Sequence, residues 1–401
     1  MKDPIQYLLN IESRGIKMGL TRTKLLMDAC GNPQNGLPVI QVAGTNGKGS
    51  VSAMLAGILK EGGYKTGLFT SPHLVEVNER IRINGTPISD TVMEQFIMDY
   101  KEAIDSLEAS FFESITALAF WYFKKGKVDV AVMETGLGGR LDSVSVCEPV
   151  ATVMTPISLD HMEILGESLM EIAIEKSGAM KQGIPCISAK QNKEVTEVLT
   201  SQAVKMESPI HFVNGEKKQS FTINLPGKIQ KENALLAAET LIQIPNFTVS
   251  ESIIHRGLQS VRWHGRNQII KENPFIVFDV AHNLDSIMNF LQYYENLCIG
   301  GDSTLIIALQ ARKRIESAIS KIESLFSKII CTQAGDRNPM PPEILADNFS
   351  AMRAVVKYSD PTNAIQHGLR SLSKEDGLAI IGSHCLGPAV SSIFKLSFAS
   401  I

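Results

Sequence analysis

Short apolar runs alternate with longer segments of helical periodicity along the first half of the chain. The apolar runs predict strands at residues 39–42, 128–133, 151–154 and 184–188. The segments between them predict helices at residues 50–61, 90–107, 113–125 and 169–181. Helices of this length suit the crossover connections between parallel strands. The first half is therefore predicted to form a mostly parallel sheet covered by helices.

A second alternating set follows Trp263, with predicted strands at residues 275–278, 304–308, 328–332 and 378–381. The fold class that we predict is α/β, with a P-loop-type, mostly parallel sheet domain followed by a smaller α/β C-terminal domain. The turn-prone segment 244–248 offers one possible boundary, but the helix after it can still belong to the first domain. We therefore place the domains at residues 1–262 and 263–401.

Composition narrows the function classes. A chain of 401 residues with 44% hydrophobic and 20% charged residues is typical of a globular protein with a large core, and its length predicts two domains. The net charge of −3 gives no electrostatic reason to expect nucleic acid, so small molecules are the expected partners. No apolar run is long enough to span a membrane, and the chain does not open on a secretory signal, so a cytoplasmic location is expected. The six cysteines form no C-x-x-C pair and are interpreted as reduced thiols.

The segment 40–50 is the strongest candidate for chemistry. An apolar strand runs into a turn with three glycines, and a helix follows, with the residues Gly44, Thr45, Asn46, Gly47, Lys48, Gly49 and Ser50. Backbone amides freed by glycines, a lysine charge and a helix N-terminus together bind the phosphates of a nucleotide. The strict P-loop pattern is not met, because Val42 stands at its first glycine and Gly49 separates Lys48 from Ser50. The alternative is a flexible connection between strand and helix.

Ionisable residues follow two of the predicted strands. Glu134 comes directly after the run 128–133, and Asp160-His161 follows the strand at 151–154. Ligands of open α/β sheets gather at the carboxyl ends of the strands. Glu134 is the natural candidate for a magnesium ligand because Mg²⁺ prefers oxygen, whereas His161 is a less expected ligand. For an isolated histidine, a hydrogen-bonded structural role is the alternative.

The order of these and further motifs resembles the folylpolyglutamate synthase and dihydrofolate synthase family, a branch of the Mur-type ligases. The resemblance covers nearly the whole chain and is closest to the bacterial bifunctional type. It rests on residues 18–20, 42–50, 70–74, 79–81, 111–113, 134–142, 160–161, 175–178, Gln230 with Asn233, Trp263 with Gly265-Arg266, Asp279 with residues 281–283, and residues 382–383.

The resemblance implies an ATP-dependent ligase that joins L-glutamate to dihydropteroate or to reduced folates through an acyl phosphate. ATP would occupy residues 44–50, Ser71 and Glu134 would hold one Mg²⁺, and His161 would help to hold a second. Lys48 would neutralise the phosphates. Lys176 matches a family lysine that is carbamylated, although on its own a lysine on a predicted helix indicates a surface charge. The catalytic set implied is Lys48, Glu134, His161 and Lys176.

The resemblance also assigns binding residues. The second domain would complete the ATP site, through matches at Asn233, Arg266, Asp279 and His282, and its closure would exclude water. The alternative for Arg266 and Asp279 is an ion pair at the domain interface. The pterin or folate would contact Phe112, Arg140 and Asp142, although an aromatic residue such as Phe112 at a helix start is also typical of a core.

Some positions depart from the family pattern. They are residues 143–145, Ile229, Gln268, Val280, Leu284 and residues 312–314, where Arg312-Lys313-Arg314 replaces an expected Lys-Asp pair. These changes lie where the substrates would be positioned. Two other functions therefore stay open: a Mur-type amide ligase for another carboxylate, and a catalytically silent ATP-binding relative. The family favours a monomer.

Overall fold

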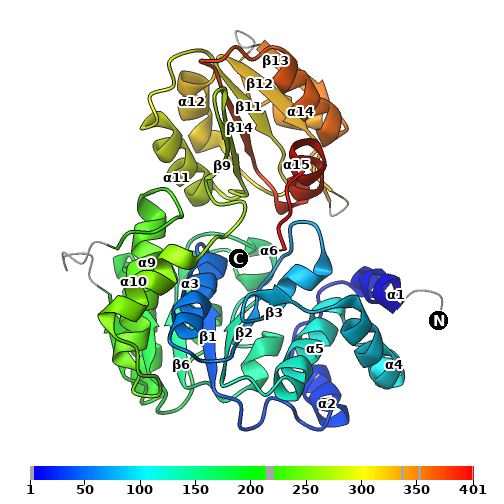
Figure 1. Cartoon of the computed structure of the whole chain (residues 1–401), viewed down its shortest axis with the longest axis vertical. Coiled ribbons are helices and arrows are strands. Elements are labelled where there is room, and N and C mark those ends of the chain that lie inside the picture. Colours follow the sequence, from blue (N-terminus) through cyan, green and yellow to red (C-terminus); the bar gives the residue numbers. More distant parts are fainter. Residues whose placement is uncertain (1–3, 214–220, 336–337, 351–353, 400) are drawn as a thin grey trace.

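The computed structural model describes residues 4–213, 221–335, 338–350, 354–399 and 401 of the chain. Two sheets, each flanked by helices, form two lobes that are joined through the segment between α10 and β9 (Figure 1). The last residues of the chain return from the second lobe to the first, so the C-terminal end lies between the lobes (Figure 1).

The sheet of the first lobe runs in the order β4-β3-β2-β5-β1-β6-β7-β8 within the described residues. Neighbours from β2 to β8 pair in parallel, whereas β3 and β4 form an antiparallel edge. The strands are β1 (Val39–Ala43), β2 (Thr66–Phe69), β3 (Ile81–Ile83), β4 (Thr86–Pro87), β5 (Val130–Glu134), β6 (Ala151–Met154), β7 (Cys186–Ser188) and β8 (Ile210–Phe212).

Both faces of this sheet are buried, as is typical of parallel sheets. Successive side chains of a strand point to opposite faces, so each strand contributes to two cores. In β5, Val130 and Val132 join one core, while Ala131 and Met133 join the core on the other face. Helices cover both faces. They are α1 (Pro4–Asn10), α2 (Thr21–Ala29), α3 (Lys48–Glu61), α4 (Asp90–Ser106), α5 (Phe111–Lys125), α6 (Met162–Leu165), α7 (Leu169–Ser177), α8 (Lys193–Lys205), α9 (Lys228–Gln243) and α10 (Glu251–Ser260), with 3-10 turns η1 (Ile11–Arg14), η2 (Val77–Arg80) and η3 (Ser143–Val146).

The second lobe has its own sheet, in the order β13-β12-β11-β14-β10-β9, which is parallel except for the edge strand β9. The strands are β9 (Gln268–Glu272), β10 (Phe275–Asp279), β11 (Ser303–Ile307), β12 (Lys328–Thr332), β13 (Ala354–Tyr358) and β14 (Gly377–Ile381). The helices are α11 (Leu284–Glu295), α12 (Glu316–Leu325), α13 (Pro342–Ala346), α14 (Pro361–Arg370) and α15 (Gly387–Phe394), with the 3-10 turn η4 (His384–Leu386). A separate hydrophobic core lies on each face of this sheet.

The predicted fold class is confirmed, and each of the eight predicted strands exists within a few residues of its expected position. The strands that the pattern missed are mostly short or at an edge, such as β9 and β13, whose residues are only partly buried. The two sheets are separated in the chain between α10 and β9, and the domain division at residue 262 stays a prediction.

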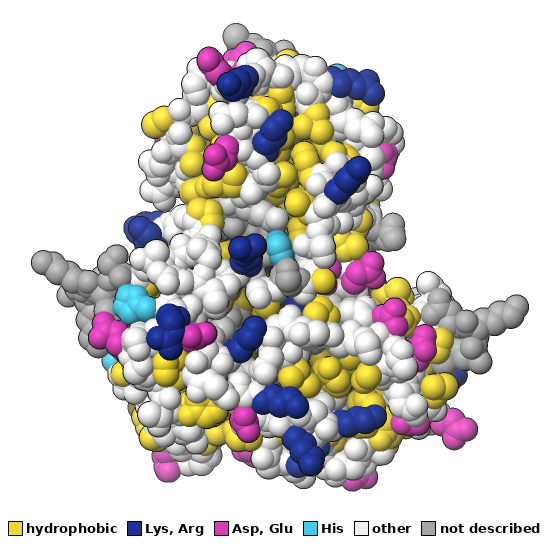
Figure 2. Space-filling model, viewed as in Figure 1, with side chains coloured by type: hydrophobic (Ala, Val, Ile, Leu, Met, Phe, Trp, Pro, Cys, Tyr) yellow, Lys and Arg dark blue, Asp and Glu magenta, His cyan; other side chains and the backbone are white. Residues whose placement is uncertain are grey.

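Charged side chains of both signs are scattered over the face shown in Figure 2. The same view shows the junction between the two lobes, the waist of the molecule. Among the described helices, none has the length and apolarity required to cross a bilayer.

Candidate active site

The phosphate loop forms where β1 passes into α3. Gly44 has a φ of +134° and Gly47 a φ of +89°, which are left-handed values that favour glycine. A Cβ on Gly44 would lie 2.1 Å from Thr155 Oγ1, and a Cβ on Gly47 would lie 2.6 Å from Asn233 Oδ1. The helix starts at Lys48, two residues before the predicted start at Ser50. The loop therefore needs its glycines for both conformation and space, which a merely flexible connection would not.

Most polar groups of this loop are hydrogen-bonded within the protein, and the hydroxyl of Ser50 is an exception. The backbone amides of Thr45 and Asn46 donate to the carbonyl oxygen of Pro156, at 3.0 and 3.2 Å. Lys48 Nζ donates to the carbonyl oxygen of Thr45 at 3.1 Å, so its charge stays over the loop. Ser50 is fully buried, and its hydroxyl has no hydrogen-bond partner in the described part of the chain. A buried hydroxyl without a partner at a helix N-terminus fits a phosphate oxygen or its metal ion.

Glu134 is brought beside this loop by the register of the sheet. Val42 of β1 pairs with Glu134 of β5, so the carboxylate lies at the level where the phosphate loop begins. Glu134 is 3% exposed, and its Oε2 accepts a hydrogen bond from the backbone amide of Ser71 at 3.0 Å. Burial raises the pKa of Glu134, while the charges of Lys48 and Arg266 oppose that rise. A buried carboxylate of this kind is stabilised by a cation.

The described residues hold no cluster of three or more His, Cys, Asp or Glu side chains that could bind a metal ion. A metal ion at Glu134 would therefore take its remaining ligands from hydroxyls, water and the nucleotide. Mg²⁺ usually binds in this way, through one or two carboxylates together with phosphates and water. The residues Glu134 and Ser71 fit such an ion.

His161 also faces this region. It has a left-handed φ of 51° and precedes α6. Burial lowers the pKa of His161 to about 4, with Asp160 opposing this and the charges of Lys313 and Lys48 adding to it. The imidazole is therefore neutral at physiological pH, which is the form that binds metals.

Lys176 is buried and not a surface charge, so the interpretation from helix position alone is wrong. The side chain is 4% exposed, and Nζ donates to the carbonyl oxygen of Gly44 at 2.7 Å. Burial and the charge of Lys48 lower the pKa of Lys176 to about 7, although Asp160 and Asp142 act against this. The surface interpretation failed because α7 packs its C-terminal turn against the phosphate loop.

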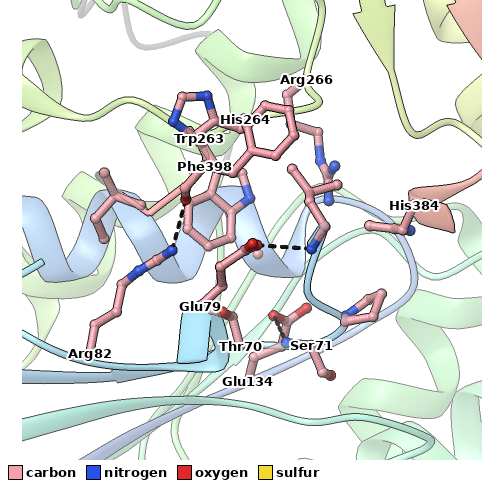
Figure 3. Close-up of a pocket in the computed structure, with 14 residues that line it drawn as sticks. Thr70, Ser71, Glu79, Arg82, Glu134, Trp263, His264, Arg266, His384 and Phe398 are labelled. Carbon is pink, nitrogen blue, oxygen red and sulfur yellow. Dashed lines mark hydrogen bonds between the residues drawn. The ribbon is translucent and has the colours of Figure 1, made fainter. Parts of the chain in front are cut away.

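A cavity between the lobes holds several of these groups (Figure 3). It is lined by Ser71 and Glu134 from the first lobe and by Arg266 and His384 from the second. Burial lowers the pKa of Arg266, while the charges of Asp279 and Glu134 raise it. Burial also lowers the pKa of His384 well below its usual range, and the charge of Arg266 adds to this effect. The cavity thus places a buried guanidinium opposite the carboxylate of Glu134.

Similar proteins place this arrangement in a family. Residues 42–183 match the Mur ligase middle domain, and residues 265–384 match the glutamate ligase domain of Mur ligases. The chain is 35% identical to a Bacillus subtilis dihydrofolate synthase/folylpolyglutamate synthase, over 79% of this chain and 81% of that protein. The chain belongs to the dihydrofolate synthase/folylpolyglutamate synthase family. It is thus an ATP-dependent ligase that forms amide bonds.

Solved structures of the family share the whole fold. The Escherichia coli FolC protein in complex with DHPP and ADP matches with a TM-score of 0.89 and 26% identity, covering 98% of this chain and 96% of that chain. A Mycobacterium tuberculosis folylpolyglutamate synthase complexed with ADP and AMPPCP matches with a TM-score of 0.88 and 26% identity, over 98% and 100% of the two chains.

The four other residues assigned to ATP approach the loop from two directions. Asn233 lies on α9, which packs against α3, so it belongs with the first lobe and does not come from the second domain as expected. Arg266, Asp279 and His282 come from the second lobe. Asp279 accepts hydrogen bonds from the backbone amides of Asn267 and Ala281, at 2.6 and 2.7 Å, so its carboxylate shapes the turn beside Arg266.

The three residues assigned to the pterin lie around the turn after β5. Phe112 is half-buried, and a Cβ on Gly136 would lie 2.5 Å from its ring, so the ring packs on that turn. Arg140 forms an ion pair with Glu175 at 2.7 Å. Asp142 accepts hydrogen bonds from the backbone amides of Leu137 and Val144, and burial raises its pKa to about 6. Contact of these three residues with a pterin remains a prediction.

Several residues that depart from the family pattern form hydrogen bonds or ion pairs in this structure. In the segment 143–145, Ser145 Oγ donates to the carbonyl oxygen of Gly139 at 2.5 Å and accepts from Gln41 Nε2 at 2.7 Å. Gln268 Oε1 accepts from the backbone amide of Gly265 at 2.9 Å, which holds the turn before Arg266. Lys313 forms an ion pair with Asp160 across the waist.

Sequence reasoning missed several residues of the cavity, among them Arg82 and His384. The signal for Arg82 was available, because an arginine between Ile81 and Ile83 breaks the apolar pattern of a short strand. His384 follows the quoted pair Gly382-Ser383, but a histidine in a turn carries little information by itself.

Proposed function

We propose that this chain adds L-glutamate to dihydropteroate and to reduced folates, with ATP converted to ADP and phosphate. The observation that carries the proposal is the register that sets Glu134 beside the phosphate loop, with buried Lys176 contacting that loop. A module that only binds a nucleotide can use the buried carboxylate for Mg²⁺, but it does not need the buried lysine that contacts the loop.

The proposed reaction has two steps. A carboxylate oxygen of the substrate attacks the γ-phosphorus of ATP, and ADP leaves. The amine of glutamate then attacks the acyl carbon, loses a proton, and phosphate leaves as the amide forms. Both steps bring anions together, so the site must neutralise charge and hold the reactants in line.

The residues divide this work. Lys48 neutralises phosphate oxygens, and the glycines of the loop let backbone amides approach them. Ser71 and Glu134 would hold one Mg²⁺, and His161 would help to hold a second; Mg²⁺ supplies further neutralisation of the phosphates. Arg266, in the second lobe, would face the negative charge of the phosphates. Carbamylation would convert Lys176 from a buried cation into an anion that binds or orients metal.

The altered segment 143–145 favours a second candidate, a Mur-type ligase for another carboxylate. The serines replace residues beside the proposed pterin contacts, and they are buried and hydrogen-bonded. A cytoplasmic location, expected from the sequence pattern, and a monomer, favoured by the family, remain predictions.

Phosphate release by the purified full chain tests the proposal. The assay contains MgATP and L-glutamate with dihydropteroate, with tetrahydrofolate, or with neither. Glutamate-dependent release with both acceptors is the expected result, and release with one assigns a single step. If neither acceptor supports release, screening of other acids and amines tests the second candidate. ATP binding without any turnover would indicate a silent relative.

A further inference from the structure

Arg82 is a buried cation whose hydrogen-bonding capacity is only partly used. It lies on β3 and is 2% exposed. Nη2 donates to the carbonyl oxygen of Phe398 at 3.1 Å, whereas Nε and Nη1 have no partner among the described residues. Buried guanidinium donors without partners are costly, so a ligand that accepts from them is favoured.

Neighbouring side chains do not provide that acceptor. Glu79 interacts electrostatically with Arg82, but its carboxylate accepts from the backbone amides of Leu74, Val75 and Glu76, at 2.9, 3.0 and 2.8 Å. Glu79 therefore shapes the loop after β2. The indole of Trp263 lies 5.9 Å from Arg82 Cζ, which covers the face of the guanidinium but accepts no in-plane hydrogen bond.

Arg82 lines the same cavity as the reacting groups but lies at a distance from them. Figure 3 shows Arg82 on one side, Arg266 and His384 on the other, and Glu134 below, with Trp263 between. Burial lowers the pKa of Arg82 to about 10, opposed by Glu79, so the group is charged at neutral pH. A ligand that spans this cavity can place one end near Glu134 and an anionic end at Arg82.

We propose that Arg82 binds the side-chain carboxylate of the incoming glutamate. The assignment rests on the proposed function, in which the glutamate amine must reach the acyl carbon near Glu134. The α-carboxylate stays close to that amine, so the side-chain carboxylate is the anion that can extend to the far end. The planar guanidinium fork matches a carboxylate. Amino acids whose side chains lack a carboxylate would leave the donors of Arg82 unpaired. Arg82 would therefore determine the specificity for glutamate among amino acids.

Steady-state kinetics of Arg82→Gln test this assignment. The KM for L-glutamate is expected to rise ~10- to 100-fold, because a charge-assisted hydrogen bond is lost. The KM for MgATP should stay within ~2-fold, because the substitution removes binding of one substrate only. The preference for L-glutamate over L-glutamine, measured as a ratio of kcat/KM values, should narrow by a similar factor. An unchanged KM for L-glutamate would overturn the assignment.

Phe398→Ala is the matched control for a purely structural role. It removes a ring that packs on Phe278 and His264 but keeps the carbonyl group that Arg82 contacts. If Arg82 only anchors the C-terminal segment around Phe398, Arg82→Gln and Phe398→Ala will change the KM values of all substrates alike. The proposal instead requires a selective change in the glutamate constant for the Arg82 variant.

Fluorescence gives a readout that does not depend on turnover. The chain has two tryptophans, so Trp121→Phe leaves Trp263 of the cavity as the single reporter. With a non-hydrolysable ATP analogue present, L-glutamate should change its emission, L-glutamine should not at equal concentration, and Arg82→Lys should abolish the response. Equal responses to both amino acids would overturn the assignment. If the wild-type chain shows no glutamate-dependent phosphate release, the proposed function itself fails; if it is active and Arg82→Gln keeps its KM, only this assignment fails.

Discussion

The Nζ atom of Lys176 lies 2.7 Å from the carbonyl oxygen of Gly44, so a buried lysine donates a hydrogen bond to the backbone of the phosphate loop. Burial, with the nearby charge of Lys48, lowers the pKa of Lys176 to about 7. A large share of this side chain is therefore neutral near pH 7, unlike an exposed lysine. The neutral amine is the form that reacts with CO₂.

Bicarbonate is expected to activate the enzyme through Lys176. The neutral amine attacks the carbon of CO₂, releases a proton and forms a carbamate, so enzyme prepared without CO₂ should gain phosphate-release activity when bicarbonate is added. The neutral fraction falls below pH 7, so more bicarbonate should be needed at pH 6 than at pH 8. Lys176→Ala should lose about 100-fold or more in kcat and recover partly with acetate.

Lys181→Ala is the control for this prediction, because the Lys181 ammonium donates to the carbonyl oxygen of Ser145 and not to the phosphate loop. It should keep its bicarbonate response. A Lys176→Ala variant with an ordinary rate, or a wild-type enzyme indifferent to bicarbonate at every pH, would contradict the carbamate.

Glu134→Gln should raise the magnesium requirement by about 10- to 100-fold and lower kcat. The substitution keeps the size of the side chain and an acceptor for the Ser71 amide, but removes the buried charge that stabilises a cation. Phosphate release as a function of Mg²⁺ concentration measures the effect. Glu148→Gln, at an exposed position, serves as the control, and matching Mg²⁺ curves for the two variants would remove Glu134 from the metal site.

The outline of the fold could be predicted from the sequence because its strands are buried on both faces. The runs at 39–42 and 151–154 each contain three apolar residues and one polar residue without regular alternation, and they form β1 and β6 of a parallel sheet. β13 was missed because an edge strand needs no such run, and two of its five residues are exposed. The local sequence pattern reflects how deeply a strand is buried, and edge strands are less buried than central ones.

The site was predictable where strand order brings chain segments together. Glu134 and the phosphate loop both follow strands, and parallel pairing of β1 with β5 sets them side by side. The burial of Lys176 and the free nitrogens of Arg82 were not predictable from spacing. Both depend on contacts between segments more than 100 residues apart in the sequence, such as Lys176 with Gly44 and Arg82 with Phe398.

Gly44→Ala should remove nucleotide binding and lower the free energy of unfolding by about 2–4 kcal/mol. The new Cβ would lie 2.1 Å from Thr155 Oγ1 and 2.8 Å from the Thr155 carbonyl oxygen, so the loop would have to move. Gly183→Ala is a matched control, because Gly183 also has a positive φ, +69°, but no atom within 4 Å of the new Cβ. It should cost about 1 kcal/mol and leave binding of an ATP analogue intact. Urea unfolding and calorimetric titration measure the two effects, and equal losses of binding would contradict the steric argument.

Lys313→Met should lower the free energy of unfolding by about 3 kcal/mol at pH 7, because it removes the lysine charge that pairs with the buried Asp160 carboxylate, which keeps only its contacts with Asn283 and His282 from the second lobe. The side chains of Lys313 and Asp160 are 12% and 7% exposed. Arg312→Met is the matched control: its ion pair with Glu163 spans 3.7 Å, its side chain is 67% exposed, and its loss should cost less than about 0.5 kcal/mol.

The pH dependence identifies the carboxylate responsible. Burial by itself would raise the pKa of Asp160, but contact with His282 and the charges of His161 and Lys313 hold it well below its usual range. A depressed carboxylate pKa gives stability that is complete above the unfolded value of about 4 and is lost as the pH falls further. The difference between wild type and Lys313→Met should therefore shrink between pH 5 and pH 3, and Asp160→Asn combined with Lys313→Met should recover part of the loss. Denaturant unfolding across this range measures it; a Lys313→Met penalty no larger than that of Arg312→Met, or one that does not change with pH, would show that this ion pair does not hold the lobes together.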